Sequence, residues 1–397
     1  MLRAVRLSRR VRLLLVARLP RVATGTQRGL RLQSATMRSA SKTSCARSVL
    51  VMAFTLLPLA AAQQERAPSP PSGAEAAGRV AGEGSGTQDT SAAAAGAGPF
   101  AAYTQVIPGT ALEFRMAPVS GGEFVMGSAD AEAGRATDEG PQRRVRVAPF
   151  WMGTCEVTWD EYEQWQFSLE VQRRAADQAL SDADKLSDAV TRPTKPYTDM
   201  TFGMGKEGFP AICMTRLAAL TYCEWLSART GRWHRLPTEA EWEFAARGGS
   251  TTRYGFGDDA AKLGEHAWFA DNSEGKTHKI GQKLPNAFGL FDMHGNVMEL
   301  CLDQYAPYAA AAEAGALLQN PFVAPKSVYP TVARGGAWNS AAAALRCAAR
   351  VGSARAWKQK DPQIPQSRWY FTDALFVGFR VVRPQVEPAP AERALFR

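Results

Sequence analysis

The sequence predicts a compact, loop-rich α+β domain held together by aromatic packing. After about residue 103, short segments of alternating apolar and polar residues, typical of strands, alternate with turns rich in Gly, Pro, Asn and Asp. The chain also holds ten Trp, and large aromatic side chains bury enough area to hold short elements together. No internal period of about 20 to 50 residues is visible, which argues against a repeat architecture.

Strand signals come first in the part that is expected to fold. Alternation bounded by Gly predicts strands at residues 113–119, 121–128 and 143–147, each with one solvent-exposed face. Residues 150–152 and 156–158 continue the pattern. These segments predict hairpins near the start of the domain.

Two helices are predicted next. Thr158 and Glu161, three residues apart, form a capping box that opens the first helix. The amphipathic pattern at residues 218–226 predicts the second helix, which Gly231 ends. Between them, the charged stretch 168–200 contains two prolines and is expected to be an inserted helix and loop.

A third helix is predicted within the stretch 234–249, HRLPTEAEWEFAARGG. Thr238 and Glu241 form a capping box, and acidic residues in the first turn suit the positive end of the helix dipole. Gly248 is a natural stop. Since Trp242 and the alanines after it recur at helical spacing, one face of this helix can be buried.

The formal net charge of +9 arises at the N-terminus. Residues 1–64 hold 12 Lys and Arg and no Asp or Glu, so the remainder of the chain carries −3, the difference between 9 and 12. A nucleic-acid surface would need its positive charge on the folded part. We therefore expect no nucleic-acid role.

Residues 37–62 have the three parts of a secretory signal peptide: a basic start, an apolar stretch at 49–59 and a small-residue cleavage site at 60–62. The apolar stretch is shorter than the roughly 18 residues that suggest a membrane span. We expect export to the periplasm or the extracellular space, with membrane contact only during export; an uncleaved anchor is the alternative. Residues 1–36 are a basic leader or a mis-assigned start.

Composition divides the rest of the chain into three parts. Residues 63–103 consist mostly of Ala, Gly, Pro, Ser and Glu, which bury too little apolar surface to offset the conformational entropy of folding. This stretch is expected to be a flexible linker. One globular domain, residues 104–386, follows, and residues 387–397 are expected to be a tail.

Five cysteines remain after removal of the signal peptide, which contains Cys45: Cys155, Cys213, Cys223, Cys301 and Cys347. In an oxidising compartment an odd number of thiols allows at most two disulfides and one free thiol, or no pairing at all. No Cys-x-x-Cys occurs, so zinc-ribbon and thioredoxin-like sites are not expected.

Ordered motifs between about residues 105 and 385 resemble those of the formylglycine-generating enzyme (sulfatase-modifying factor) family. Residues 235–249 resemble its hallmark segment, and residues 286–297, NAFGLFDMHGNV, resemble its Gly-Leu-x-Asp-Met-x-Gly-Asn-Val segment. Further matches lie at residues 121–128, 156–158, 222–227, 334–338 and 378–380.

This resemblance implies a loop-rich sulfatase-modifying-factor fold related to C-type lectin-like folds, with two main helices. It also implies a founding activity, the oxidation of a cysteine in unfolded sulfatases to formylglycine. That reaction uses molecular oxygen and a copper ion held by two cysteine thiolates. Soft thiolates select Cu(I), which explains the need for cysteine at such a site.

The chain departs from the family where copper would bind. The family's two copper cysteines stand four residues apart between motifs that residues 334–338 and 346–350 resemble, but here alanine fills residues 341–344. The chain has no Cys-x4-Cys, and Cys347 matches a structural cysteine of the family. Alanine offers no electron pair to a metal, so copper is not expected.

The family's structural disulfides are not expected either. The partner that the resemblance assigns to Cys223 would stand at Val381, and the partner of Cys347 would stand near Ala245 and Ala246. Neither position holds a cysteine.

A calcium site around the Gly-Asn-Val segment is also implied by the resemblance. Its ligands would correspond to the carboxylates of Asp292 and Glu299 and the backbone carbonyls of Gly295 and Val297. Such oxygens suit a hard cation with flexible geometry. The alternative is a turn that satisfies its own hydrogen bonds.

Other acidic and histidine residues suggest sites less directly. His266, His278 and His294, with nearby acids, could suggest an iron site, but their spacing matches no ligand signature and turn or surface roles are favoured. Glu239, Glu241 and Glu243 could suggest paired catalytic acids. Neighbours two residues apart point to different sides of a helix, so capping and solvation are the favoured explanation.

Four residues are candidates for ligand binding near the stretch where the family has its copper-binding cysteines: Trp338, Asn339, Ser340 and Trp369. Aromatic side chains there could stack on a peptide or a sugar, and core packing is the alternative for each of them.

We therefore weigh three hypotheses of function. The first is an exported, non-catalytic member of the family, a calcium-stabilised module that binds an extended peptide or glycan. The second is a sulfatase-maturation oxidoreductase, or a related metal-dependent oxidase, with a divergent site. The third is an accessory subunit that binds an active paralogue or a sulfatase.

Overall fold

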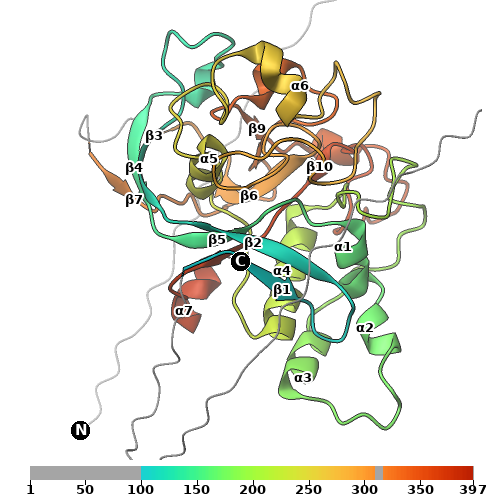
Figure 1. The fold of residues 1–397 in the computed structure, drawn as a ribbon. Coiled ribbons are helices and arrows are strands. Elements are labelled where there is room, and N and C mark those ends of the chain that lie inside the picture. Colours follow the sequence, from blue (N-terminus) through green and yellow to red (C-terminus); the bar gives the residue numbers. More distant parts are fainter. Residues whose placement is uncertain (1–99, 309–315, 397) are drawn as a thin grey trace, which may run out of the picture. The chain divides into compact units, whose positions relative to one another are not determined.

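The computed structural model describes residues 100–308 and 316–396, which Figure 1 follows from blue to red. The predicted signal peptide and nearly all of the predicted linker lie outside the described residues. The first strand, β1 (Tyr103–Val106), begins where the composition changes. Among the helices of the described residues, none is both long and apolar enough to cross a membrane.

A four-stranded antiparallel sheet lies at the centre of the domain. Its strand order is β1, β2 (Glu113–Val119), β5 (Phe150–Gly153) and β11 (Val382–Pro384). Neighbours β5 and β11 are far apart in sequence, so this sheet joins the start of the domain to its end.

Two further sheets, one of three strands and one of four, complete the strands of the described residues. One is a ribbon of β3 (Gly122–Met126) and β4 (Arg143–Val147), extended by β7 (Leu318–Gln319). The other has the order β10 (Val377–Gly378), β6 (Met298–Gln304), β8 (Thr331–Arg334) and β9 (Arg350–Gly352). The strands predicted at residues 113–119 and 143–147 are confirmed with those bounds.

The central sheet buries both of its faces, because alternate residues of a strand point to opposite sides. On one face Met116 and Trp151 enter the largest hydrophobic cluster. On the other face Ala117 and Phe150 pack into a second cluster with Trp242. The sheet therefore separates two parts of the core.

Helices α1 to α4 are grouped together, coloured green to yellow-green in Figure 1. Their bounds are α1 (Trp159–Gln166), α2 (Leu169–Gln172), α3 (Asp182–Asp188) and α4 (Arg216–Thr230). Tyr162 of α1 stacks on Tyr222 of α4, with ring centroids 5.8 Å apart. The charged insertion predicted at 168–200 supplies α2 and α3.

The predicted helix caps and stops are confirmed by hydrogen bonds and backbone angles. The hydroxyls of Thr158 and Thr238 accept from the backbone N–H groups of Glu161 and Glu241, at 3.3 and 3.2 Å. Gly231 ends α4 in the left-handed region with φ of 66°, and Gly248 likewise ends α5 (Glu239–Arg247) with φ of 57°. Local sequence therefore placed these ends correctly.

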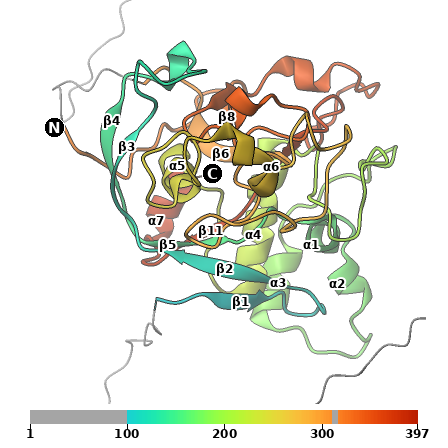
Figure 2. The same cartoon turned by 45° about the horizontal axis from the view of Figure 1, so that its top comes forward.

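Helix α5 is buried on all sides, which corrects the expectation that its acidic residues are solvated. Figures 1 and 2 show it beside β3 and β6. Glu239, Glu241 and Glu243 are 3, 7 and 0 % exposed. Each carboxylate is paired with arginine: Glu241 with Arg235, Glu239 with Arg350, and Glu243 with Arg334 and Arg247. Burial of these charges is tolerated because every one of them is paired.

Two further segments differ from expectation. Residues 156–158 form an isolated bridge at Thr158, paired with Pro210, instead of a strand. Residues 387–396, expected to be a tail, fold into α7 (Pro390–Arg393) and η5 (Ala394–Phe396). The remaining short helices are η1 (Thr137–Glu139), η2 (Ala260–Lys262), α6 (Leu263–His266), η3 (Ala342–Leu345) and η4 (Arg355–Lys358).

Candidate functional site

The alanine run that follows β8 forms the short helix η3 at the surface. Ala341 and Ala343 are exposed, whereas Leu345 is buried in a small cluster with Tyr254 and Phe269. Gly336, with φ of 68°, lies so close to this helix that a Cβ there would stand 2.8 Å from Leu345 Cδ1. The segment therefore folds back tightly, with small side chains where the resemblance implies metal-binding thiolates.

Arg346 anchors the far end of this segment. Its guanidinium donates to the carboxylates of Glu132 and Glu139, at distances of 2.5 to 2.7 Å, and to the carbonyl of Gly134 at 2.7 Å. Its Nε donates to the carbonyl of Ala343 at 2.8 Å. Because these bonds tie η3 to the loop between β3 and β4, the alanine run is held in one conformation.

The four predicted binding residues have different surroundings. Trp338 is half-buried and donates from Nε1 to the carbonyl of Leu375 at 3.2 Å, while Asn339 is exposed. Ser340 Oγ accepts from the N–H of Ala337 at 3.0 Å, so it caps a local turn. Trp369 packs edge-on against Trp165 of α1, with centroids 6.0 Å apart. Both tryptophans therefore contact the hydrophobic core.

The carboxylate of Glu299, a predicted calcium ligand, is engaged by protein donors. Its carboxylate accepts two hydrogen bonds from Arg380, at 2.5 and 2.6 Å, and one from Trp242 Nε1 at 2.7 Å. Both oxygens are therefore engaged by protein donors. Glu299 therefore balances a buried arginine, and its role as a calcium ligand stays a prediction.

Asp292 has a different environment. Its Oδ2 accepts from the N–H of Gly281 at 2.7 Å, whereas Oδ1 is buried without a donor. The neighbouring carboxyl of Glu156 accepts from Asn296 at 3.1 Å through Oε1, and its Oε2 also lacks a donor. Burial, together with the charge of Asp292, raises the pKa of Glu156 well above its usual range. A proton held on Glu156 supplies the donor that this pair of acids lacks.

Gly295 and Val297, whose carbonyls the resemblance assigns to calcium, lie on the same buried turn as Asp292 and Asn296. Asp292 and Asn296 adopt positive φ angles of 55° and 52°, so the turn is tightly constrained. Within the described residues, no group of three or more His, Cys, Asp or Glu side chains is arranged to hold a metal ion.

The histidines hold structural positions. His294 is buried, donates from Nδ1 to the carbonyl of Leu345 at 2.7 Å and accepts at Nε2 from the N–H of Gly255 at 3.1 Å. His278 stacks on Trp268 with centroids 3.8 Å apart, and His266 stacks on Phe256 at 4.2 Å. These contacts give each ring a packing role.

All five cysteines of the described residues are unpaired. Burial raises the pKa of each thiol, in the case of Cys347 to about 12. The thiol form, which is a poor metal ligand and nucleophile, therefore predominates at neutral pH. Cys223 and Val381 share one core cluster, and Cys347 shares another with Ala245 and Ala246.

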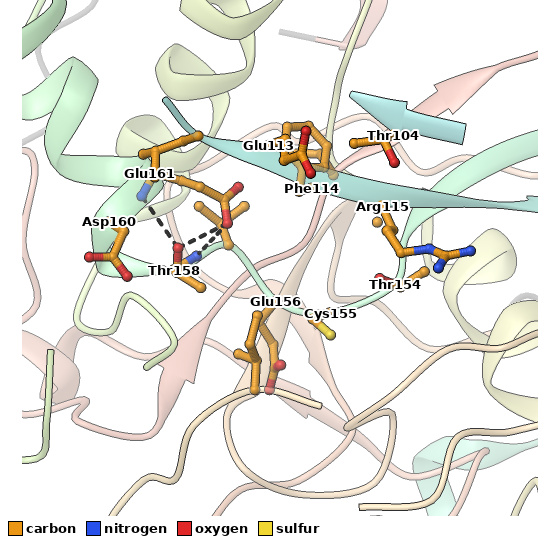
Figure 3. Close-up of a pocket in the computed structure, with 15 residues that line it drawn as sticks. Thr104, Glu113, Phe114, Arg115, Thr154, Cys155, Glu156, Thr158, Asp160 and Glu161 are labelled. Atoms are coloured by element: carbon orange, nitrogen blue, oxygen red, sulfur yellow. Dashed lines mark hydrogen bonds between the residues drawn. The ribbon is translucent and has the colours of Figure 1, made fainter. Parts of the chain in front are cut away.

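A cavity of about 350 Å³ lies between β2 and the start of α1, away from the residues that the sequence had singled out as binding residues. Figure 3 shows Thr158, Asp160 and Glu161 at one end and Arg115 at the other, with Glu113 between them on β2. Sequence reasoning identified Glu161 as a capping residue only. No local signal could have shown that it also faces a cavity.

The fold and these motifs define a mixed helix-and-sheet domain of the sulfatase-modifying factor type. A family model described as the sulfatase-modifying factor enzyme 1-like domain matches residues 109–384, and the chain therefore belongs to that family.

Similar proteins include formylglycine-generating enzymes and serine/threonine-protein kinases. The chain is 30 % identical over 222 residues to the formylglycine-generating enzyme of Streptomyces coelicolor, covering 47 % of this chain and 68 % of the enzyme. It is 32 % identical over 238 residues to the serine/threonine-protein kinase pkn1 of Chlamydia pneumoniae, covering 59 % of this chain. The match spans just 35 % of that kinase.

Among solved structures, variable protein 1 of Treponema denticola superimposes with a TM-score of 0.52. The alignment covers 71 % of this chain and 99 % of that protein at 20 % identity. This similarity supports the mixed helix-and-sheet fold expected from the sequence.

Proposed function

We propose that this protein is an exported, non-catalytic member of the family that binds an extended peptide or glycan. The observation that carries the proposal is the alanine run 341–344. It occupies the interval where the resemblance places the copper-binding cysteines, and methyl groups supply no ligand to a metal.

The state of the remaining thiols supports the same proposal. Cys347, the cysteine nearest to the run, is fully buried in the core with a raised pKa. It is therefore poorly suited to replace a copper thiolate. Calcium at the turn of Asp292, Gly295 and Val297 would stabilise this module, as the resemblance implies.

The proposed ligand surface surrounds residues 338–343. Asn339, Ala341 and Ala343 are exposed there, and Trp338 is half-buried beside them. An exposed run of small side chains lets a backbone approach closely, and the indole edge of Trp338 offers apolar contact. An extended peptide or a glycan therefore suits this surface.

Turnover of a sulfatase-motif peptide tests the proposal. The purified protein, supplied with copper and oxygen, should form no formylglycine by mass spectrometry, while the Streptomyces coelicolor enzyme converts the same peptide. Binding of the peptide, or of a sugar on a glycan array, should weaken when Asn339→Arg places a bulky charge on the surface. Formylglycine formation would overturn the proposal.

A sulfatase-maturation oxidoreductase is the second candidate, favoured by the 30 % identity to a formylglycine-generating enzyme. The turnover assay separates the two candidates. The accessory-subunit hypothesis predicts that a pull-down recovers an active paralogue or a sulfatase from the same extract. Export predicts that the mature protein begins at Gln63, which N-terminal mass spectrometry can check.

A further inference from the structure

The cavity between β2 and α1 carries an excess of acidic groups. Its lining includes four carboxyl groups, those of Glu113, Glu156, Asp160 and Glu161, and one guanidinium, that of Arg115. Arg115 lies at the opposite end from Glu161 in Figure 3. Apolar side chains form the walls between these ends: Leu112, Phe114, Val157, Ile280 and Val381.

One oxygen of Glu161 is unused by the fold. Its Oε1 accepts from the hydroxyl of Thr158 at 2.9 Å and from the N–H of Thr158 at 3.3 Å, which completes the capping box. Its Oε2 has no partner among the described residues, although the side chain lines the cavity and the residue is only 8 % exposed. Figure 3 shows this carboxyl group turned towards Phe114 across the cavity.

This oxygen is open to the cavity, whereas most of the side chain is buried. Burial raises the pKa of Glu161 to about 7, so the surroundings of this side chain disfavour the carboxylate. A cation at Oε2 would reverse this effect. The neighbouring Asp160, whose Oδ2 accepts from the N–H of Gly208 at 2.7 Å, adds negative charge at the same end.

We propose that this cavity binds a primary ammonium group at the end of an aliphatic chain, with Glu161 Oε2 as its principal acceptor. A compact ammonium suits a single free oxygen, whereas a guanidinium favours two parallel acceptors and one of the two oxygens is already used by the cap. The apolar walls accommodate the methylene chain. Two sources present this chemistry, a lysine side chain of a peptide and a free alkyldiamine.

This inference is separate from the proposed non-catalytic role, because the cavity shares no lining residue with the segment 335–350. The formylglycine assay therefore has no bearing on it. Binding of an amine would leave the question of turnover open.

Binding is measured on the whole protein by titration calorimetry at pH 8. The probes are Nα-acetyl-lysine amide, its Nε-acetylated form, which lacks the charge, and 1,5-diaminopentane. We expect saturable binding of at least one charged probe and none of the acetylated form. Preference for the lysine amide assigns a peptide ligand, and preference for the diamine assigns a free amine. Failure of both charged probes to bind would overturn the proposal.

Glu161→Gln is the diagnostic variant, because the amide retains an acceptor for the capping box while losing the charge. It should weaken amine binding by about tenfold or more, the loss expected for a charge-assisted hydrogen bond. Glu163→Gln is the matched control, since Glu163 lies on the same helix, pairs with Lys206 and does not line the cavity. Equal affinity of the Glu161→Gln variant and the wild type would refute the role of Glu161.

The wild-type protein gives a second test that needs no variant. Groups facing Glu161 in the cavity are Glu113, Asp160, Arg115, Cys155 and Glu156, and the last two have pKa values raised by burial. Since Glu161 gains a proton as the pH falls through about 7, affinity for the charged probe should drop about tenfold between pH 8 and pH 6. Affinity that is constant over this range would contradict the assignment.

Discussion

Glu299 on β6 and Arg380 form a buried bidentate ion pair, with N–O distances of 2.5 and 2.6 Å. Both side chains are at most 1 % exposed. The pair holds the connection before β11 against β6, next to the turn where calcium was expected. It gives the carboxylate at this position a structural role as the counter-charge of Arg380.

Removing this carboxylate should destabilise the protein irrespective of calcium. Glu299→Ala leaves Arg380 buried and unpaired, which costs about 3 to 5 kcal/mol in the free energy of unfolding. Urea unfolding in calcium and in chelator should show the same loss. Glu123→Ala, which removes an exposed partner of Arg144 and Arg146, serves as the control and should have little effect. A loss confined to the calcium sample would restore Glu299 as a ligand.

The buried acids Glu156 and Asp292 should make the protein less stable as the pH rises, whereas an ion-paired carboxylate makes a protein less stable as the pH falls. The pKa of Glu156 is raised in the folded protein, so the folded state holds a proton that the unfolded state releases, and stability falls as pH rises above the unfolded pKa of 4.5. Glu156→Gln should therefore stabilise the protein at pH 8, because the amide needs no proton to stay uncharged.

The gain from Glu156→Gln should shrink towards pH 5, where the wild-type side chain is protonated more readily in both states. Denaturant unfolding of wild type and variant at pH 5, 6.5 and 8 measures it. Equal stability of the variant and the wild type at pH 8 would contradict a proton held on Glu156.

His294 should make the protein less stable as the pH falls. Its two ring nitrogens bond to Leu345 and Gly255, and burial lowers its pKa to about 4. Between the unfolded value of about 6.5 and pH 4, the unfolded chain binds a proton that the folded chain excludes, so up to about 3 kcal/mol is lost.

Comparison of unfolding free energies at pH 7 and pH 5 tests this effect. His294→Gln should remove the part of the pH dependence of the unfolding free energy that His294 contributes. His234, whose pKa is also lowered by burial, should still contribute its part. His266→Gln is the control, because that ring lies nearer the surface. A slope unchanged by His294→Gln would contradict the prediction.

The C-terminal segment should contribute to stability. Phe396 packs against Trp233 and Phe322, with ring centroids 5.5 and 5.2 Å apart, and the guanidinium of Arg235 lies 5.2 Å from its ring. Because Phe396 is half-buried, Phe396→Ala should cost about 1 to 2 kcal/mol, less than a fully buried phenylalanine. Urea unfolding measures this cost. Leu395→Ala, at a side chain 64 % exposed, should change little; equal effects would argue that the segment is not docked.

Local sequence determined several helix ends and strands. The caps at Thr158 and Thr238 join residues three positions apart, and the strands at 113–119 and 143–147 follow from alternation alone. Interactions of this kind are encoded within one turn or one strand, so a single sequence reveals them. The ordered motifs, in turn, identified the family, which the match to residues 109–384 confirms.

Tertiary structure decided which charged residues are buried and which partners they pair with. The acids of α5 looked solvated in sequence, yet Glu239 and Glu243 meet Arg350 and Arg334, which lie 111 and 91 residues away. Glu161 likewise shows a capping box in sequence and a cavity in the structure. Burial and ion pairing depend on which distant segments pack together, and no local pattern encodes that choice.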